Sequence, residues 1–222
     1  MAMLDYPEEF HQMMKFICDD SMNYVRWQQE EVILELNNEN DFAGSGSYGF
    51  TSELPKSMEY SETGKVTAKD LWANMNSQES VGLSPTMYGE FLYPYYREMA
   101  EQFGLVYYGC CEAVNTIWDD YLSRLPNLRK VSISPWCDEE FMGDRLRGQD
   151  IIYSRKPSPN FVGVGDKIDE EAFSKHIRKT LQAAKDCHLE IIFRDIYTLN
   201  GDTTKPGKAV KIVRQLIEDM WS

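Results

Sequence analysis

Two adjacent cysteines followed by a glutamate, Cys110, Cys111 and Glu112, are the residues of this sequence best suited to chemistry. A cysteine thiolate is a soft ligand for zinc, and zinc binding deprotonates a thiol. Glu112 could add an oxygen ligand or act as an acid–base partner. Neighbouring side chains of an extended segment point in different directions, so we expect only one cysteine to face a site. The alternatives are that both cysteines fill the core and that Glu112 lies at a helix start, where the helix dipole favours a carboxylate.

Arg155 and Lys156 place two cations side by side. Arginine can bind a carboxylate or phosphate through two parallel hydrogen bonds, so this pair in an acidic chain indicates an anionic substrate. The alternative is an ion-pair network with Glu79, Glu112 or Asp195. Asp195 could itself be a ligand, a base or a cap, and we expect a functional role because it follows the last predicted strand.

Two aromatic residues lie near these polar groups. Tyr108 and Trp136 could form an apolar wall against a flat ligand, although aromatic side chains at such positions more often pack in the core. The three histidines are not placed for activating a nucleophile: His11 and His176 lie in predicted helices, and His188 precedes the last predicted strand. A Ser-His or Cys-His hydrolase is therefore not favoured.

The chain after residue 68 alternates strand-like and helix-like segments, which would position these residues. Such alternation is typical of a parallel sheet with crossover helices, and five βα units in a row favour a (β/α) barrel or part of one. Active sites of barrels lie at the carboxyl ends of the strands, where Glu79, the cysteine pair and the other candidates are found. The predicted strands are one that ends near Gln78 and Glu79, then Leu105–Tyr108, Lys130–Ser134, Asp150–Ser154 and Leu189–Arg194.

Turn and cap signals place helices between these strands. Ser84 and Pro85 open a helix that Pro94 should kink and that Gly104 ends. Periodic apolar residues indicate the other helices. These are predicted at 114–124, at 138–146, after the cap Asp169 with Phe173, Ile177 and Leu181 on one face, and after Pro206 with Val210, Val213, Ile217 and Met220 facing inward.

The region before residue 68 has a different character. Asp5 and Pro7 begin a predicted helix, and Val32–Leu36 is a candidate for a sixth strand. Segment 37–65 is rich in Asn, Gly and Ser, which indicates a long loop within a single domain spanning 1–222. The residues expected on the buried side of the first helix are Phe10, Met13, Met14 and Ile17.

The number of strands is too small for a closed barrel. A complete eightfold barrel needs about 250 residues, whereas this chain has 222. We therefore expect the α/β class and a partial TIM-type (β/α)₈ barrel of five or six βα units, corresponding to the C-terminal part of a larger barrel. Open sheet edges would then favour a homo-oligomer or pairing with the missing N-terminal barrel part.

Composition restricts the classes of partner and the compartment. The formal net charge of −13 argues against nucleic acid and anionic membranes. The acidic segment Met1–Phe10 lacks the features of a signal peptide, and the apolar runs are too short to cross a bilayer. The five scattered cysteines have no zinc-finger spacing. These features predict a cytoplasmic protein with reduced thiols and no membrane partner.

Several segments of the chain resemble the uroporphyrinogen decarboxylase superfamily, and most closely a subgroup whose strand ends in Tyr-Gly-Cys-Cys-Glu. The resemblance covers essentially the whole chain but only the later part of the family's barrel. It implies a (β/α)₈ fold, which agrees with the alternation above. The matching segments are Val81–Pro85, Glu90–Tyr95, Phe103–Glu112, Pro126–Lys130, Ser134–Trp136 and Ser154–Pro157.

The resemblance implies two possible activities. The methyltransferases of the superfamily serve corrinoid proteins and hold zinc through a His-x-Cys pair and a later cysteine. Cys110 matches the cysteine of the first motif, but Tyr108 stands at the histidine, and Arg194-Asp195 stands where the last cysteine is expected. The decarboxylase acts on a tetrapyrrole without cofactor, and its hallmark Arg and Asp residues lie in the N-terminal barrel part.

Together these observations predict a methyltransferase that moves a methyl group to or from a corrinoid carried by a partner protein. Cys110, Glu112 and Asp195 form the predicted catalytic centre, and Cys110 with Glu112 would hold zinc. A small anionic substrate is expected. The alternatives are tetrapyrrole decarboxylation and a non-catalytic half-barrel subunit. The predicted substrate-binding residues are Glu79, Tyr108, Trp136, Arg155 and Lys156.

Overall fold

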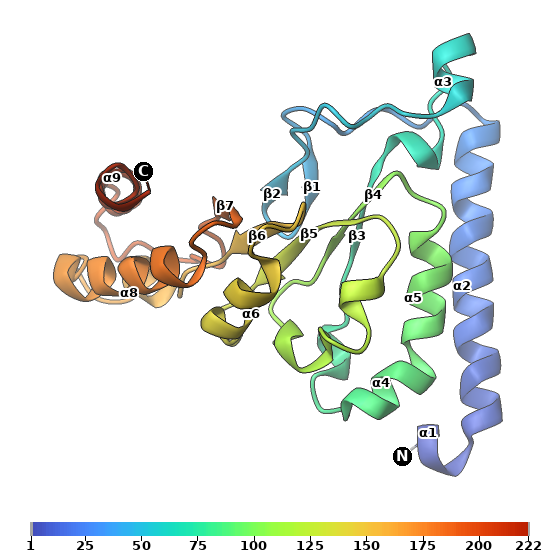
Figure 1. Cartoon of the computed structure of the whole chain (residues 1–222), viewed down its shortest axis with the longest axis horizontal. Coiled ribbons are helices and arrows are strands. Elements are labelled where there is room, and N and C mark those ends of the chain that lie inside the picture. The colour runs from blue at the N-terminus through green and yellow to red at the C-terminus, as the bar shows by residue number, and fades with distance from the viewer. Residues whose placement is uncertain (1, 222) are drawn as a thin grey trace. The chain divides into compact units, whose positions relative to one another are not determined.

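Five parallel strands form the main sheet of residues 2–221, the part of the chain that this computed structural model describes. Their order in the sheet, β3-β4-β5-β6-β7, follows their order along the chain (Figure 1). The predicted α/β class with a parallel sheet flanked by helices is therefore confirmed. The strands are β3 (Trp72–Met75), β4 (Leu105–Tyr108), β5 (Leu128–Ile133), β6 (Ile152–Arg155) and β7 (His188–Ile191).

The chain divides into two compact units, which are described separately. The first runs to Cys110 and includes Thr116–Lys130; the second comprises Cys111–Asn115 and the chain from Val131 onward. The first unit holds α1 (Ala2–Asp5), α2 (Pro7–Glu30), the strands β1 (Phe42–Gly44) and β2 (Ser47–Tyr48), α3 (Met58–Thr63), α4 (Pro85–Phe91) and α5 (Tyr93–Ala100). The second holds α6 (Glu139–Leu146), α7 (Asn160–Gly163), α8 (Glu170–Ala183) and α9 (Lys205–Met220).

Local sequence signals determine the helices of the first unit. The Ser84 side chain caps α4 by accepting a hydrogen bond from the backbone N–H of Met87 at 3.2 Å. Pro94 lies in the first turn of α5, and the helical conformation is interrupted between α4 and α5 there, as predicted. Helix α2 runs beside α5 (Figure 1), where the His11 ring stacks on Phe91 with 4.9 Å between centroids.

The start of β3 is held by polar side chains of the first unit. The Asn37 amide accepts from the Trp72 backbone N–H at 2.9 Å and donates to the Trp72 carbonyl at 3.1 Å. Asp70 is fully buried and accepts bonds from the backbone N–H and hydroxyl groups of Ser57 and Thr67. Burial alone would raise the pKa of Asp70, but these hydrogen bonds outweigh it and lower the pKa.

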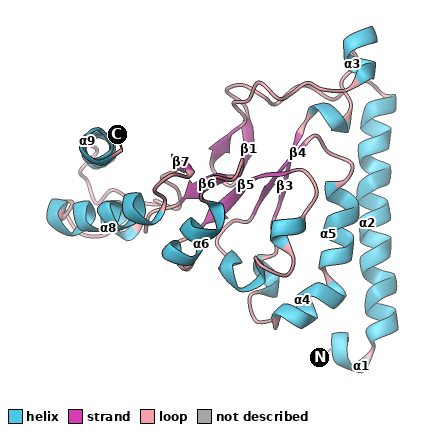
Figure 2. Cartoon of the chain, viewed as in Figure 1, coloured by secondary structure: helices cyan, strands magenta, loops and turns pink. Residues whose placement is uncertain are grey.

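The core of the second unit lies around α8 and α9. Asp169 caps α8 by accepting from the Ala172 N–H at 2.9 Å, and Phe173, Ile177 and Leu181 are buried on one face, as predicted. The predicted inward face of α9 is wrong in part: Val213 is buried, but Val210 is exposed. The long connection between β7 and α9 is loop (Figure 2).

Three further predictions about elements are wrong. Segment 114–124 forms two 3₁₀ turns, Val114–Ile117 and Leu122–Arg124, because Asn, Thr, Asp and aromatic residues give it weak helix propensity. Segment Val32–Leu36 is not a strand, since α2 runs on to Glu30 and Val32 then turns with a φ of 55°. Segment 37–65 is not only loop, because β1, β2 and α3 lie within it.

Strand and helix boundaries also differ from those predicted. β3 ends at Met75 and β7 at Ile191, so Glu79 and Asp195 follow their strands at a distance of four residues each. On α2, Met13 and Ile17 are exposed rather than buried. No helix among residues 2–221 has the length and apolar composition needed to cross a membrane.

Candidate functional site

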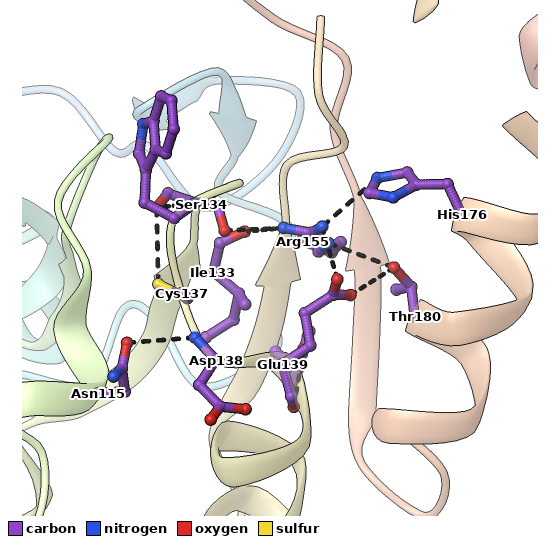
Figure 3. Close-up of polar contacts among 11 residues, drawn as sticks. Asn115, Ile133, Ser134, Cys137, Asp138, Glu139, Arg155, His176 and Thr180 are labelled. Carbon is purple, nitrogen blue, oxygen red and sulfur yellow. Dashed lines mark hydrogen bonds and ion pairs between the residues drawn. The ribbon is translucent and has the colours of Figure 1, made fainter. Parts of the chain in front are cut away.

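A buried polar network in the second unit surrounds Arg155, the last residue of β6 (Figure 3). The Arg155 side chain is 1% exposed and forms an ion pair with Glu139, Nη2 to Oε1, at 2.8 Å. Its Nη1 donates to the carbonyls of Ile133 and Ser134 at 3.1 and 2.8 Å. Its Nε donates to the Thr180 hydroxyl at 3.2 Å, and that hydroxyl donates to Glu139 Oε2 at 2.5 Å. The guanidinium is therefore fully engaged inside the protein.

These contacts fit the alternative in which Arg155 supports an ion-pair network, although its partner is Glu139 rather than Glu79, Glu112 or Asp195. His176 completes the network, with Nε2 lying 3.4 Å from Arg155 Nη2 (Figure 3). Burial lowers the pKa of His176, and the positive charge of Arg155 lowers it further. His176 is thus held in its neutral form, in which a ring nitrogen can accept from arginine.

Glu112 and Ser134 belong to a second group of contacts, next to the first along β5. The Ser134 hydroxyl and the Cys137 thiol both donate to the Glu112 carbonyl, at 3.2 and 3.6 Å. The Asn115 side-chain oxygen accepts from the Asp138 N–H at 3.2 Å (Figure 3). The Glu112 side chain itself is buried. This group anchors the segment that follows Cys111 to the carboxyl end of β5.

Asp195 contacts the second cysteine of the pair. The Cys111 thiol donates to Asp195 Oδ2 at 3.8 Å, and Arg194 Nε forms an ion pair with Asp195 Oδ1 at 3.2 Å. Asp195 adopts a left-handed backbone with a φ of 60°, an uncommon conformation for a residue other than glycine. Its side chain is 33% exposed. The carboxylate is therefore oriented from both sides and still reachable from solvent.

Lys156 and Trp136 differ sharply in exposure. Lys156 directly follows β6 and is 2% exposed, with Nζ donating to the Ser132 hydroxyl at 2.5 Å. Trp136 is 75% exposed and is free of close packing on most of its surface. Because β5, β6 and β7 are parallel neighbours, the residues that follow them lie at one edge of the sheet. The exposed Trp136 is thus better placed than Lys156 to meet a ligand arriving from solvent.

The remaining candidates lie in the first unit. Tyr108 is buried, and its hydroxyl lies 2.8 Å from that of Tyr88, so it packs in the core. Glu79 is exposed on a short 3₁₀ turn. Cys110 is half-buried and follows Gly109, whose φ is 97° and whose carbonyl accepts from Ser45 at 2.8 Å. Cys110 thus belongs to a different unit from Glu112 and Asp195.

A zinc ion at Cys110 and Glu112 would need further ligands close by. Among residues 2–221, no three side chains of the types His, Cys, Asp or Glu are grouped closely enough to hold a metal. Zinc in proteins needs three or four such ligands. Zinc bound by Cys110 and Glu112 therefore stays a prediction.

Sequence reasoning did not find Glu139, Thr180 or His176. Each looks ordinary in its own helix: Glu139 is a first-turn carboxylate of α6, and the other two lie within α8. Their roles follow from their common contact with Arg155. The only available signal was the arginine itself, since a buried guanidinium at a strand end requires a carboxylate nearby.

No protein-family profile matches this chain, and no curated protein sequence matches it significantly.

Proposed function

We propose that this chain is a methyltransferase of the uroporphyrinogen decarboxylase-like superfamily, built on a partial (β/α) barrel, which moves a methyl group between a corrinoid and a thiol. The sequence segments of the resemblance support this proposal. The strand order supports it as well, because the order of a doubly wound sheet reverses at a switch point, whereas that of a barrel follows the chain.

The observation that carries the proposal is the oriented carboxylate of Asp195. A thiol attacks a methyl group only as it loses its proton, so the reaction needs a base within reach of the sulfur. Asp195 is partly exposed, and Cys111 and Arg194 hold its two oxygens. Asp195 is the general base in this proposal, and Cys111 and Arg194 are positioning residues.

The methyl transfer needs no reagent other than the methyl donor and the thiol. The thiol sulfur forms a bond to the methyl carbon, and the bond between that carbon and the corrinoid cobalt breaks. The bonding electron pair stays with the cobalt, and the thiol proton passes to Asp195. The buried Arg155 network holds β6 and α8 in place but does not touch the substrate.

The test is demethylation of methylcobalamin by 2-mercaptoethanol, followed by absorbance under anaerobic conditions. We expect the wild type to exceed the uncatalysed rate and Asp195→Asn to lose about 10²- to 10⁴-fold, the usual contribution of a general base. Cys111→Ser keeps a donor to Asp195 and should retain most activity, whereas Cys111→Ala should lose more. Asp219→Asn, on the exposed surface of α9, is the matched control.

Two outcomes would contradict this proposal in different ways. A wild type no faster than the uncatalysed reaction excludes the activity with this donor and acceptor. An active wild type with an unchanged Asp195→Asn rate excludes the assigned base. Cys110→Ala tests the catalytic role that the sequence predicted for Cys110, because a large loss there would transfer the central role to the first cysteine.

A further inference from the structure

A pocket of about 290 Å³ lies between β7 and α9, within the second unit. On the strand side it is lined by Leu189 and Ile191, which alternate positions of β7 turn to the same face, and by Phe193 two residues further on. On the helix side, Val210 and Ile217 are seven residues apart and therefore share one face of α9. In the described part of the chain β7 is the last strand of the sheet, so no neighbouring strand contributes side chains that would fill this space. We call this space the β7–α9 pocket.

The β7–α9 pocket has one charged side chain in its lining, that of Arg214, within the part of the chain that the structure describes. Arg214 is exposed on α9, and among residues 2–221 no hydrogen bond or ion pair engages its guanidinium. No carboxylate of these residues lines the pocket. Glu190 lies on the opposite face of β7, because side chains alternate along a strand. The pocket thus combines apolar walls with a positive charge that the protein itself leaves available, although the chain as a whole has a net charge of −13.

The size of the pocket and its charge restrict the occupant. Small-molecule sites have volumes of about 300–1,000 Å³ and are mostly apolar, with a few polar groups that fix the orientation of the ligand. The β7–α9 pocket is at the lower end of this range, so it fits a single short alkyl chain rather than a lipid with two long ones. A lone arginine balances one negative charge and can bind a carboxylate through two parallel hydrogen bonds.

We propose that the β7–α9 pocket binds a small alkyl monocarboxylate. The hydrocarbon chain of this ligand packs against Leu189, Ile191 and Ile217, and its carboxylate pairs with Arg214. The hydrocarbon chain supplies most of the affinity, because each buried methylene group contributes about fourfold to the binding constant. The arginine supplies the preference for an anion, which is about fivefold because the guanidinium is exposed and partly screened by water.

Isothermal titration calorimetry of the full chain at neutral pH tests the proposal with octanoate, hexanoate and 1-octanol. Octanoate should bind about 15-fold more tightly than hexanoate, since it buries two more methylene groups. It should bind about fivefold more tightly than 1-octanol, which has the same chain without the charge. Added salt should weaken the binding of octanoate but not that of 1-octanol.

Two variants locate the site. Arg214→Gln should abolish the preference for octanoate over 1-octanol and leave the affinity for 1-octanol unchanged. Lys211→Gln is its matched control, because Lys211 is exposed on the same helix but does not line this pocket. Val210→Trp places a larger side chain at the pocket and should weaken the binding of both ligands. Val164→Trp is the control for this change, since Val164 is 62% exposed and lies outside the pocket. Circular dichroism of each variant checks that the fold is retained.

Three outcomes would overturn the proposal. The first is a wild type that does not bind octanoate, and the second is 1-octanol binding as tightly as octanoate. The third is octanoate binding that Arg214→Gln or Val210→Trp leaves unchanged, because the ligand would then lie elsewhere. None of these results bears on the methyl-transfer assay, since neither Asp195 nor Cys111 lines the β7–α9 pocket.

Discussion

The buried ion pair between Arg155 and Glu139 gives a quantitative test of the second unit. Glu139→Gln keeps the size of the side chain but leaves the guanidinium, which is 1% exposed, without its charge partner. Removing one member of a buried pair costs about 3–5 kcal/mol. The carbonyls of Ile133 and Ser134 still accept from Arg155, so we expect the lower end, about 3 kcal/mol, which corresponds to a melting temperature lower by about 6–12 °C.

Urea unfolding followed by circular dichroism measures this loss, and hydrogen exchange in α6 and α8 locates it. Glu140→Gln is the matched control, since Glu140 is exposed in the same helical turn, and its effect should stay within about 0.5 kcal/mol. Replacing Glu139 and Arg155 together by methionine should recover part of the loss, because no uncompensated charge remains. A Glu139→Gln variant as stable as Glu140→Gln would refute the reasoning.

Three further predictions concern stability. Because the pKa of Asp70 is lowered in the folded state, its carboxylate stabilises the fold above the unfolded pKa of about 4, and this stability is lost as the pH falls through the folded pKa. Asp70→Asn should therefore make the melting temperature depend less on pH in the acid range. Gly143→Ala should destabilise by about 1–3 kcal/mol in urea unfolding, because the added Cβ would lie 1.9 Å from the Ala183 carbonyl oxygen; Gly207→Ala, with open space around it, should not. The lowered pKa of His176 means that stability falls as pH drops below about 6.5, where the unfolded state takes up the proton first. His176→Phe should remove that step from the same plot.

Local signals in the sequence were sufficient for much of the fold. Ser84, Asp138 and Asp169 each cap a helix where the sequence predicts one, because a capping side chain acts within three residues. Strand β4 has the predicted bounds, since its continuous apolar run is buried on both faces. The alternation of these elements then determined the class of the fold.

Contacts between distant segments could not be predicted in the same way. Glu139 and Arg155 meet because α6 connects β5 to the neighbouring strand β6. No local feature of the sequence distinguishes Glu139 from other carboxylates in the first turn of a helix. The contact of Cys111 with Asp195 joins residues 84 positions apart, so no local signal in the sequence indicates it. On α2, periodicity predicted one buried side that includes Met13 and Ile17, but both of these side chains are exposed.

The side chain of Asn37 has a consequence for how this sheet can grow. A primary amide carries N–H donors beside a carbonyl acceptor, so it can offer the donor and acceptor that the backbone of an added strand would present. Bound to both backbone groups of Trp72, it stands in for a neighbouring chain at the start of β3. The growth of sheets into fibres needs two unpaired sheet edges in each molecule. By occupying the backbone groups of Trp72, Asn37 leaves fewer groups on this edge strand for templated aggregation.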